Sequence, residues 1–130
     1  MVERKIRIGD TTSWVELARA DEGEWRVTAD WCSTFTADFA VCLTDGEVAD
    51  FATRTLTALS KGGYVSTVVT EGRNNPLKLG IQPVEDFYAV FARLTRNGDD
   101  EVCQLQLEMG PVDAHGLRDA LELLHLLLTP

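Results

Sequence analysis

Cys32 and Cys42 stand among three aspartates in the segment ADWCSTFTADFAVCLTDGE, residues 29–47. Thiols and carboxylates are residue types that bind metal ions or carry out redox chemistry. On one extended strand the two cysteines would lie roughly 33 Å apart, at about 3.3 Å per residue. A chain turn near Cys32 also carries Cys42 away from it. The spacing therefore predicts two unlinked thiols beside a β-sheet rather than a metal or redox site.

The two histidines are also placed too far apart to share a metal ion. His115 and His125 fall on one predicted helix, where ten residues correspond to about 15 Å along the axis. We interpret His115 as a residue of the first helical turn and His125 as one at the edge of the interior. Glycine-rich phosphate-binding loops, nucleophile elbows and H-E-x-x-H motifs are missing from the sequence. We therefore expect no catalytic residues, no metal and no cofactor.

Two acidic clusters are candidates for calcium binding through carboxylate oxygens. One contains Asp21, Glu22 and Glu24, and the other is the run Asp99-Asp100-Glu101. Neither has the twelve-residue spacing of a calcium-binding loop. We interpret both as solvated turns.

Length and composition predict one domain over residues 1–130, in the size range of common domains. The formal net charge is −9, and a field of that sign repels nucleic acid but attracts a basic protein. Three cysteines without C-x-x-C spacing and a start that lacks a signal-peptide core predict a cytoplasmic protein. The longest apolar run, LLHLLL, is much shorter than the ~20 residues of a membrane span.

Alternating side chains from Trp25 onward predict strands with one buried and one solvated face. The odd positions from Trp25 to Leu43 are mostly apolar, and the even positions are mostly polar. This parity places Trp25 and Trp31 in the core and leaves the position of Trp14 open. A three-residue turn over Cys32-Ser33-Thr34 preserves the alternation between two strands.

The period then changes from two to 3.6 residues. Thr44 and Glu47 have the spacing of a capping box, which predicts a helix start, and the glycines after Ser60 predict its end. A second helix is predicted from an N-cap at Asp113. The residues expected on the buried stripes are Val48, Phe51, Ala52, Leu56 and Leu59 in the first helix, and Leu117, Ala120, Leu121, Leu124 and Leu128 in the second.

The dipeptide Asn97-Gly98 suits a two-residue type I′ hairpin turn. That turn predicts the cross-strand pairs Leu94–Glu101, Ala92–Cys103, Val90–Leu105 and Tyr88–Leu107. In this register Cys103 lies in the core. Counting all elements, we predict an α+β fold in which about seven strands form a mainly antiparallel meander, with two amphipathic helices packed on one face.

The sheet face that the helices leave uncovered is the candidate binding surface. It combines polar residues of the first hairpin with two aromatic residues that an isolated monomer has little reason to expose. This face serves either as a partner site, a homodimer contact included, or as a solvated surface. The candidate partner-binding residues are Asp30, Asp38, Phe87, Phe91, Gln104 and Gln106.

The order of elements, with paired strands before LTDGEVADFATRTLTAL and VDAHGLRDALELLHLLL at the end, resembles WapI-type immunity proteins and related small bacterial domains of unknown function. The resemblance covers nearly the whole chain. It implies a small acidic α+β protein, in some members an antidote that binds a co-encoded toxin, and it carries over no catalytic residue.

These observations favour a non-enzymatic cytoplasmic binding protein, an inhibitor of a basic toxin that uses carboxylates and an aromatic anchor. The alternative is a small-molecule-binding domain with a pocket between sheet and helices, near Trp14 and His115. Nucleic acid and membranes are not expected partners.

Overall fold

The first third of the chain forms a four-stranded antiparallel meander. The computed structural model describes residues 3–71, 75–96 and 103–129. Trp25, Val27 and Ala29 are buried while the residues between them face outward, which confirms the predicted alternation. The strands, in sequence and spatial order, are β1 (Lys5–Gly9), β2 (Ser13–Asp21), β3 (Glu24–Trp31) and β4 (Phe35–Cys42).

A second antiparallel sheet follows the first helix. Its order is β5-β6-β7-β8, and the two-residue strand β9 pairs with the beginning of β7. The strands are β5 (Val65–Val68), β6 (Leu77–Val84), β7 (Phe87–Leu94), β8 (Leu105–Glu108) and β9 (Val112–Asp113).

The predicted register between β7 and its C-terminal neighbour is wrong by four residues. Leu94 pairs with Leu105, and Ala92 pairs with Leu107. The Asn97-Gly98 turn lies outside the described residues. Four is an even number, so the inward and outward faces are those predicted. Alternation fixes the face of a strand but not its position along its neighbour. Directly after β7, the Thr95 amide donates to the Pro76 carbonyl at 3.1 Å, so the chain stays beside the β6 segment for one more residue.

This register also corrects the prediction for Cys103. The position opposite Ala92 belongs to Leu107, which is buried. Cys103 comes before β8 and is exposed. It is therefore not a core residue.

The two helices begin where their caps predict. In α1 (Asp45–Ser60) the Thr44 hydroxyl accepts from the Glu47 amide at 3.0 Å, and the Glu47 carboxylate accepts from the Thr44 amide at 2.9 Å. In α2 (Ala114–Leu128) the Asp113 carboxylate accepts from the Gly116 amide at 2.8 Å. In the described part of the chain, neither helix combines the length and apolar character that a bilayer-spanning helix requires.

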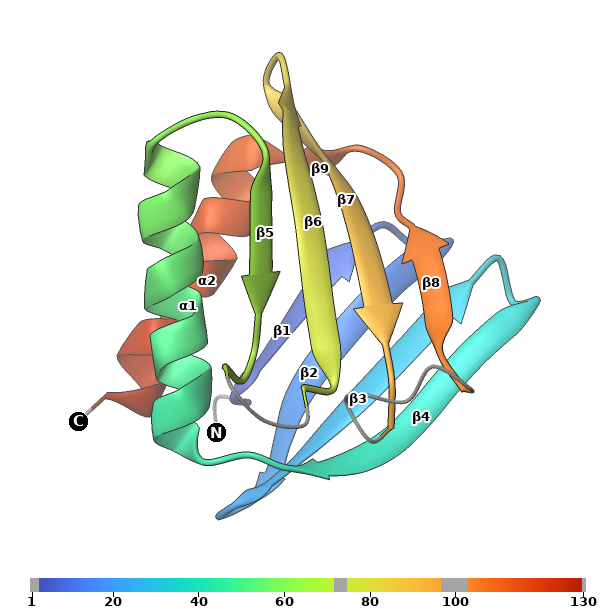
Figure 1. Cartoon of the computed structure of the whole chain (residues 1–130), viewed down its shortest axis with the longest axis vertical. Coiled ribbons are helices and arrows are strands. Elements are labelled where there is room, and N and C mark those ends of the chain that lie inside the picture. Colours follow the sequence, from blue (N-terminus) through green and yellow to red (C-terminus); the bar gives the residue numbers. More distant parts are fainter. Residues whose placement is uncertain (1–2, 72–74, 97–102, 130) are drawn as a thin grey trace.

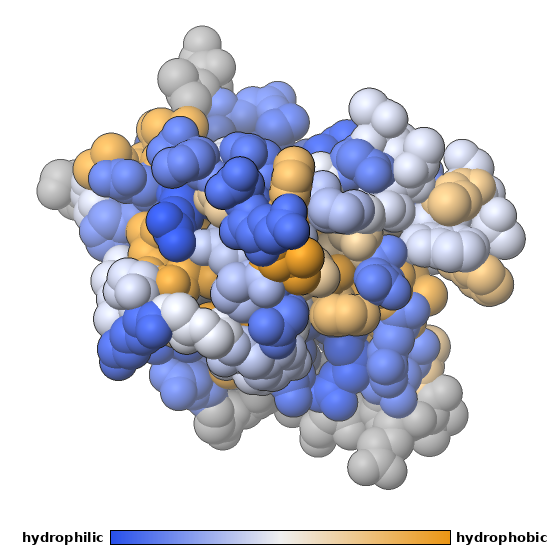
Figure 2. All heavy atoms as spheres, turned by 90° about the horizontal axis from the view of Figure 1, so that it is seen from above, coloured by the Kyte–Doolittle hydropathy of each residue, from blue (hydrophilic) through white to orange (hydrophobic). Residues whose placement is uncertain are grey.

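The two sheets lie face to face with their strands crossing at an angle, and the helix pair closes one side of this sandwich (Figure 1). Helix α1 runs beside β5, and α2 lies next to β1. One continuous core joins inward side chains of both sheets and both helices. The α+β class, the antiparallel strands and the two packed amphipathic helices are confirmed, with nine described strands in two sheets. The end of the molecule shown in Figure 2 has small hydrophobic patches scattered among hydrophilic side chains.

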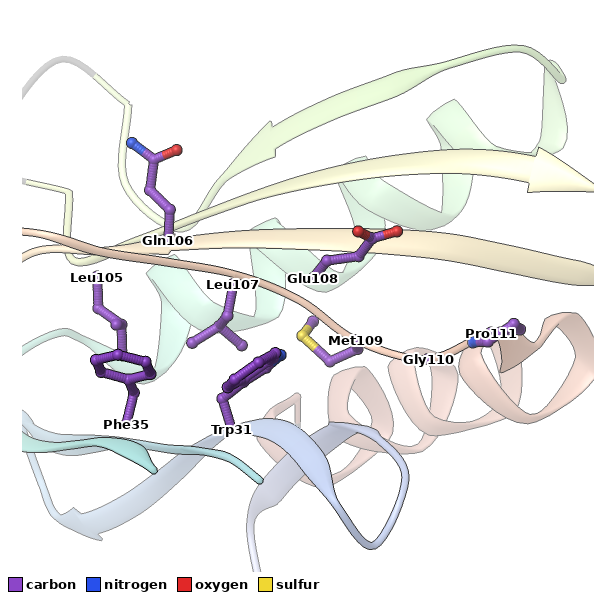
Figure 3. A pocket seen from close by; sticks show the side chains of 9 residues that line it. All are labelled: Trp31, Phe35, Leu105, Gln106, Leu107, Glu108, Met109, Gly110 and Pro111. Atoms are coloured by element: carbon purple, nitrogen blue, oxygen red, sulfur yellow. The ribbon is translucent and has the colours of Figure 1, made fainter. Parts of the chain in front are cut away.

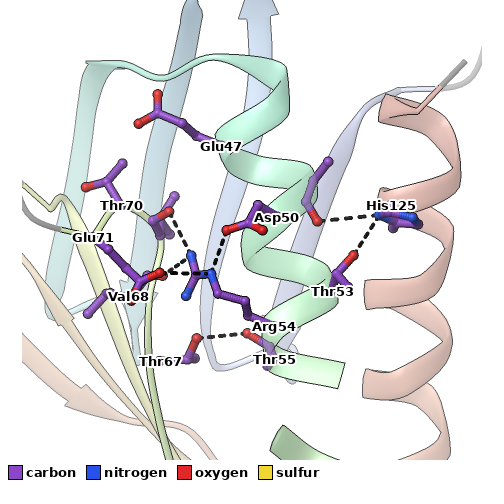
Figure 4. Close-up of polar contacts among 12 residues, drawn as sticks. Glu47, Asp50, Thr53, Arg54, Thr55, Thr67, Val68, Thr70, Glu71 and His125 are labelled. Atoms are coloured by element: carbon purple, nitrogen blue, oxygen red, sulfur yellow. Dashed lines mark hydrogen bonds and ion pairs between the residues drawn. The ribbon is translucent and has the colours of Figure 1, made fainter. Parts of the chain in front are cut away.

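Polar contacts attach α1 to both neighbours (Figure 4). Arg54 donates to the Val68 carbonyl at 3.1 Å and forms ion pairs with Asp50 and Glu71. On the other side of α1, Nδ1 of His125 lies 2.9 Å from the Thr53 hydroxyl. His125 is thus half-buried at the helix contact, where the sequence places it.

Replacing Thr44 by alanine should lower the free energy of unfolding by about 1 kcal/mol, because the Glu47 amide loses its acceptor at the helix start. Thr57→Ala is the matched control, since Thr57 is exposed within α1, and it should change stability by less than about 0.5 kcal/mol. Urea unfolding followed by circular dichroism measures both. Equal effects of the two substitutions would contradict the capping role.

Candidate functional site

The open side of the sandwich, away from the helices, contains an apolar cleft of about 530 Å³. Trp31 and Phe35 line it from the first sheet (Figure 3). Leu105, Leu107 and Met109 point toward these rings from the second sheet, while Gln106 and Glu108 point to the opposite side of β8. We call this cleft the aromatic groove; its lining residues are Trp31, Phe35, Leu105, Gln106, Leu107, Glu108, Met109, Gly110 and Pro111.

The β3–β4 turn brings the two aromatic rings of the groove together. Trp31 and Phe35 are cross-strand partners with ring centroids 6.1 Å apart, which confirms the predicted three-residue turn. Cys32 and Ser33 have φ angles of 53° and 58°, a conformation that non-glycine residues rarely adopt. The Asp30 carboxylate supports it by accepting from the Ser33 amide at 2.7 Å. Asp30 therefore holds the turn that presents the rings.

The prediction that Trp31 belongs to the core is wrong. Its parity is correct, but 38% of its surface is exposed, as is 56% of Phe35. Trp25, on the same strand face, is fully buried and donates from Nε1 to Asp45 at 3.2 Å. The difference arises because the short strand β8 is the last element above the hairpin and covers its tip only in part.

The far wall of the groove is fixed by the β1–β2 loop. The Gly110 amide donates to the Ser13 hydroxyl at 3.4 Å, and a Cβ on Gly110 would lie 2.7 Å from a carboxylate oxygen of Asp10. Hydrogen bonds from the Ser13 and Thr12 amides and from the Thr12 hydroxyl lower the pKa of Asp10. A side chain at position 110 would thus collide with the loop that holds this segment in place.

The six predicted partner-binding residues do not form one surface. Phe87 and Phe91 are 45% and 44% exposed on the outward face of the second sheet, as predicted. Gln106 lies opposite Arg93, and Gln104 is exposed before β8. The residue opposite Phe91 is Glu108, because of the shifted register.

Asp30 and Asp38 belong to the outward face of the first sheet, on the other side of the sandwich. Asp38 forms an ion pair with Arg26 on the neighbouring strand, and Asp30 accepts within the β3–β4 turn. Both carboxylates therefore have local partners. The structure brings Phe91 and Gln106 together around one hollow but separates them from these aspartates.

The other residues singled out by sequence have ordinary surroundings. The Arg7 guanidinium lies 3.8 Å from the centroid of the Trp14 ring, and His115 is exposed in the first turn of α2. Cys32 and Cys42 are exposed and form no disulfide. Among the described residues no three histidine, cysteine, aspartate or glutamate side chains are close enough to hold a metal ion. The cluster of residues 99–101 lies outside the described part.

Sequence reasoning missed the aromatic groove. One signal was available, since Trp31 and Phe35 flank a predicted turn, and strand ends are the positions where a facing sheet is least able to cover a side chain.

Comparisons of the chain with protein-family models, curated proteins and solved structures each find no match.

Trp31→Ala should lower the free energy of unfolding by about 1 kcal/mol, because the ring is only partly covered. Trp25→Ala, six residues earlier on the same strand face, should cost about 3–5 kcal/mol. Chemical denaturation measures the two losses side by side. Similar losses would mean that the Trp31 ring is packed as tightly as that of Trp25.

The outward face of β7 gives a second contrast. Phe91→Ser should leave stability within about 1 kcal/mol, whereas Val90→Ser should cost at least about 2 kcal/mol because Val90 is fully buried. Thermal unfolding of both variants tests this. The reverse order of stabilities would show that the two faces of β7 are exchanged.

Proposed function

We propose that the chain is a non-enzymatic protein-binding domain whose binding surface is the aromatic groove. The observation that carries this proposal is the exposed Trp31–Phe35 pair, which faces the apolar side chains of β8 across an open cleft. Aromatic residues in partly enclosed apolar sites supply much of the binding energy of protein interfaces. An apolar side chain of a partner would fill the cleft and cover both rings.

The charge of the chain favours a basic partner. Its 21 acidic and 12 basic side chains give a net charge of −9, and such a field accelerates the approach of a positively charged protein. The apolar anchor then supplies affinity, while the net charge of the chain supplies attraction over distance. Increasing salt should therefore slow association more than it speeds dissociation.

The resemblance of its order of elements to that of WapI-type immunity proteins suggests what the partner is. We propose that it is a basic toxin and that this chain acts as its antidote in the cytoplasm. Binding through the aromatic groove would cover the basic surface with which the toxin engages its own target. Inhibition then requires occlusion alone and no catalytic residue.

The proposal predicts that a toxin encoded beside this gene binds the chain and loses its toxicity on co-expression. Calorimetry should give a saturable one-to-one complex. Trp31→Ser or Phe35→Ser should weaken that complex about 30-fold or more, which corresponds to about 2 kcal/mol for a buried anchor.

Phe87→Ser is the matched control, because Phe87 is similarly exposed but lies on the outward face of the second sheet. It should leave affinity unchanged. A loss with Phe87→Ser but none with Phe35→Ser would move the binding surface to that outward face. The absence of any binding neighbouring gene product would contradict the immunity function itself.

Small-molecule binding is the second candidate function, and the size of the aromatic groove favours it. A volume of about 530 Å³ lies in the range of ligand pockets, although this cleft lies between the two sheets and not beside Trp14 and His115. NMR titration with a panel of apolar compounds separates the two functions. Saturable shifts at Leu105 and Leu107, without a protein partner, would favour the small molecule.

A further inference from the structure

The outward face of the second sheet contains a second hollow, of about 450 Å³, on the other side of β8 from the aromatic groove. Two cross-strand rows form its floor. The first row is Lys78, Arg93 and Gln106, and the second is Gly80, Phe91 and Glu108, each taken from β6, β7 and β8 in turn. Tyr64, which precedes β5, completes the lining.

The first row consists of hydrogen-bond donors, and its two cations are directly opposed. Cross-strand partners have Cβ atoms about 5 Å apart, and like charges at that spacing destabilise a sheet. Lys78 and Arg93 are both exposed, and neither has an ion-pair partner among the residues that the structure describes. In a chain of net charge −9, an unneutralised pair of adjacent cations matches an anionic ligand.

The second row makes room for an aromatic side chain. A Cβ at Gly80 would lie 2.4 Å from the Tyr64 hydroxyl oxygen, so the Tyr64 side chain crosses the sheet where β6 has no side chain. A glycine inside a strand weakens it and commonly marks such a close approach. Phe91 lies opposite Gly80. The hollow thus has two aromatic side chains, Tyr64 and Phe91. Beside them lie the ammonium of Lys78, the guanidinium of Arg93, the amide of Gln106 and the carboxylate of Glu108.

We propose that this hollow binds a small aromatic oxyanion, a planar ring that carries a phosphate or a carboxylate group. The oxyanion would accept from Lys78, Arg93 and the amide of Gln106, because charge-assisted hydrogen bonds are the strong ones. The ring would lie against Tyr64 and Phe91. Glu108, at the Phe91 end, repels a second negative charge and orients the ligand with its anionic group toward Lys78. This site shares residues of β8 with the aromatic groove but lies on the opposite face of that strand, and it does not rest on the function proposed for the groove.

NMR titration of the intact chain with phenyl phosphate and with phenylacetate tests the site and identifies the oxyanion. At least one probe should bind saturably, with a Kd on the order of 1 mM for a ligand of this size. Inorganic phosphate and phenol, the two fragments, should each bind several-fold more weakly. The shifts should centre on Lys78, Gly80 and Phe91.

Five variants test this site and its difference from a general charge effect. Lys78→Gln and Arg93→Gln should each weaken binding about fivefold or more, without lowering the melting temperature, because each removes a like-charge contact. Glu108→Gln should strengthen binding. Lys61→Gln, which removes an exposed cation at the end of α1, should have no effect. Gly80→Ala should reduce the affinity toward that of the bare anion, because its methyl group displaces the Tyr64 hydroxyl.

Two results would overturn the proposal. One is the lack of saturable binding of both aromatic probes by the folded wild-type chain. The other is a loss of affinity in Lys61→Gln equal to that in Arg93→Gln, since this would mean that net charge and not the donor row holds the anion.

Discussion

The inner faces of the two sheets bury their apolar side chains against each other, and the helix pair closes only one side of that contact. Each fully buried large side chain contributes about 1.5–3 kcal/mol, so Trp25, Phe51 and Leu121 need cover from a facing element. Near the helices the inward side chains of both sheets are covered, because α1 packs beside β5 and α2 packs beside β1. On the opposite side it depends on the four residues of β8, and the aromatic groove is the space that this short strand leaves.

Local chemistry explains why much of the fold could be predicted. The Thr44–Glu47 box, the Asp113 cap and the alternation through β3 and β4 each depend on residues close in sequence, and each determines one element by itself. The two faces of β7 also follow from side-chain alternation, since Val90 and Phe91 differ in parity. These features need no knowledge of what packs against them.

The features that could not be predicted depend on partners distant in sequence. The register of β8 is fixed by its fit along β7, and a shift of four residues preserves every face, so alternation cannot detect it. Trp31 is exposed because of where the second sheet ends, which is a property of another part of the chain. For the same reason the predicted partner-binding residues do not form one surface. Asp30 and Asp38 lie on the first sheet, whereas Phe87 and Phe91 lie on the second.

The groove also lies between the last strands of both sheets. Among the described strands, β4 pairs only with β3, and β8 pairs only with β7, so each has one edge of backbone amides and carbonyls without a neighbouring strand. Such edges can template edge-to-edge aggregation, and charge is a common protection against it. The net negative charge supplies this protection near neutral pH and vanishes near the isoelectric point of about 4.6. We therefore expect the chain to aggregate most readily in acid. Copies of the chain would first join through the unpaired edges of β4 and β8, beside Phe35 and Leu105.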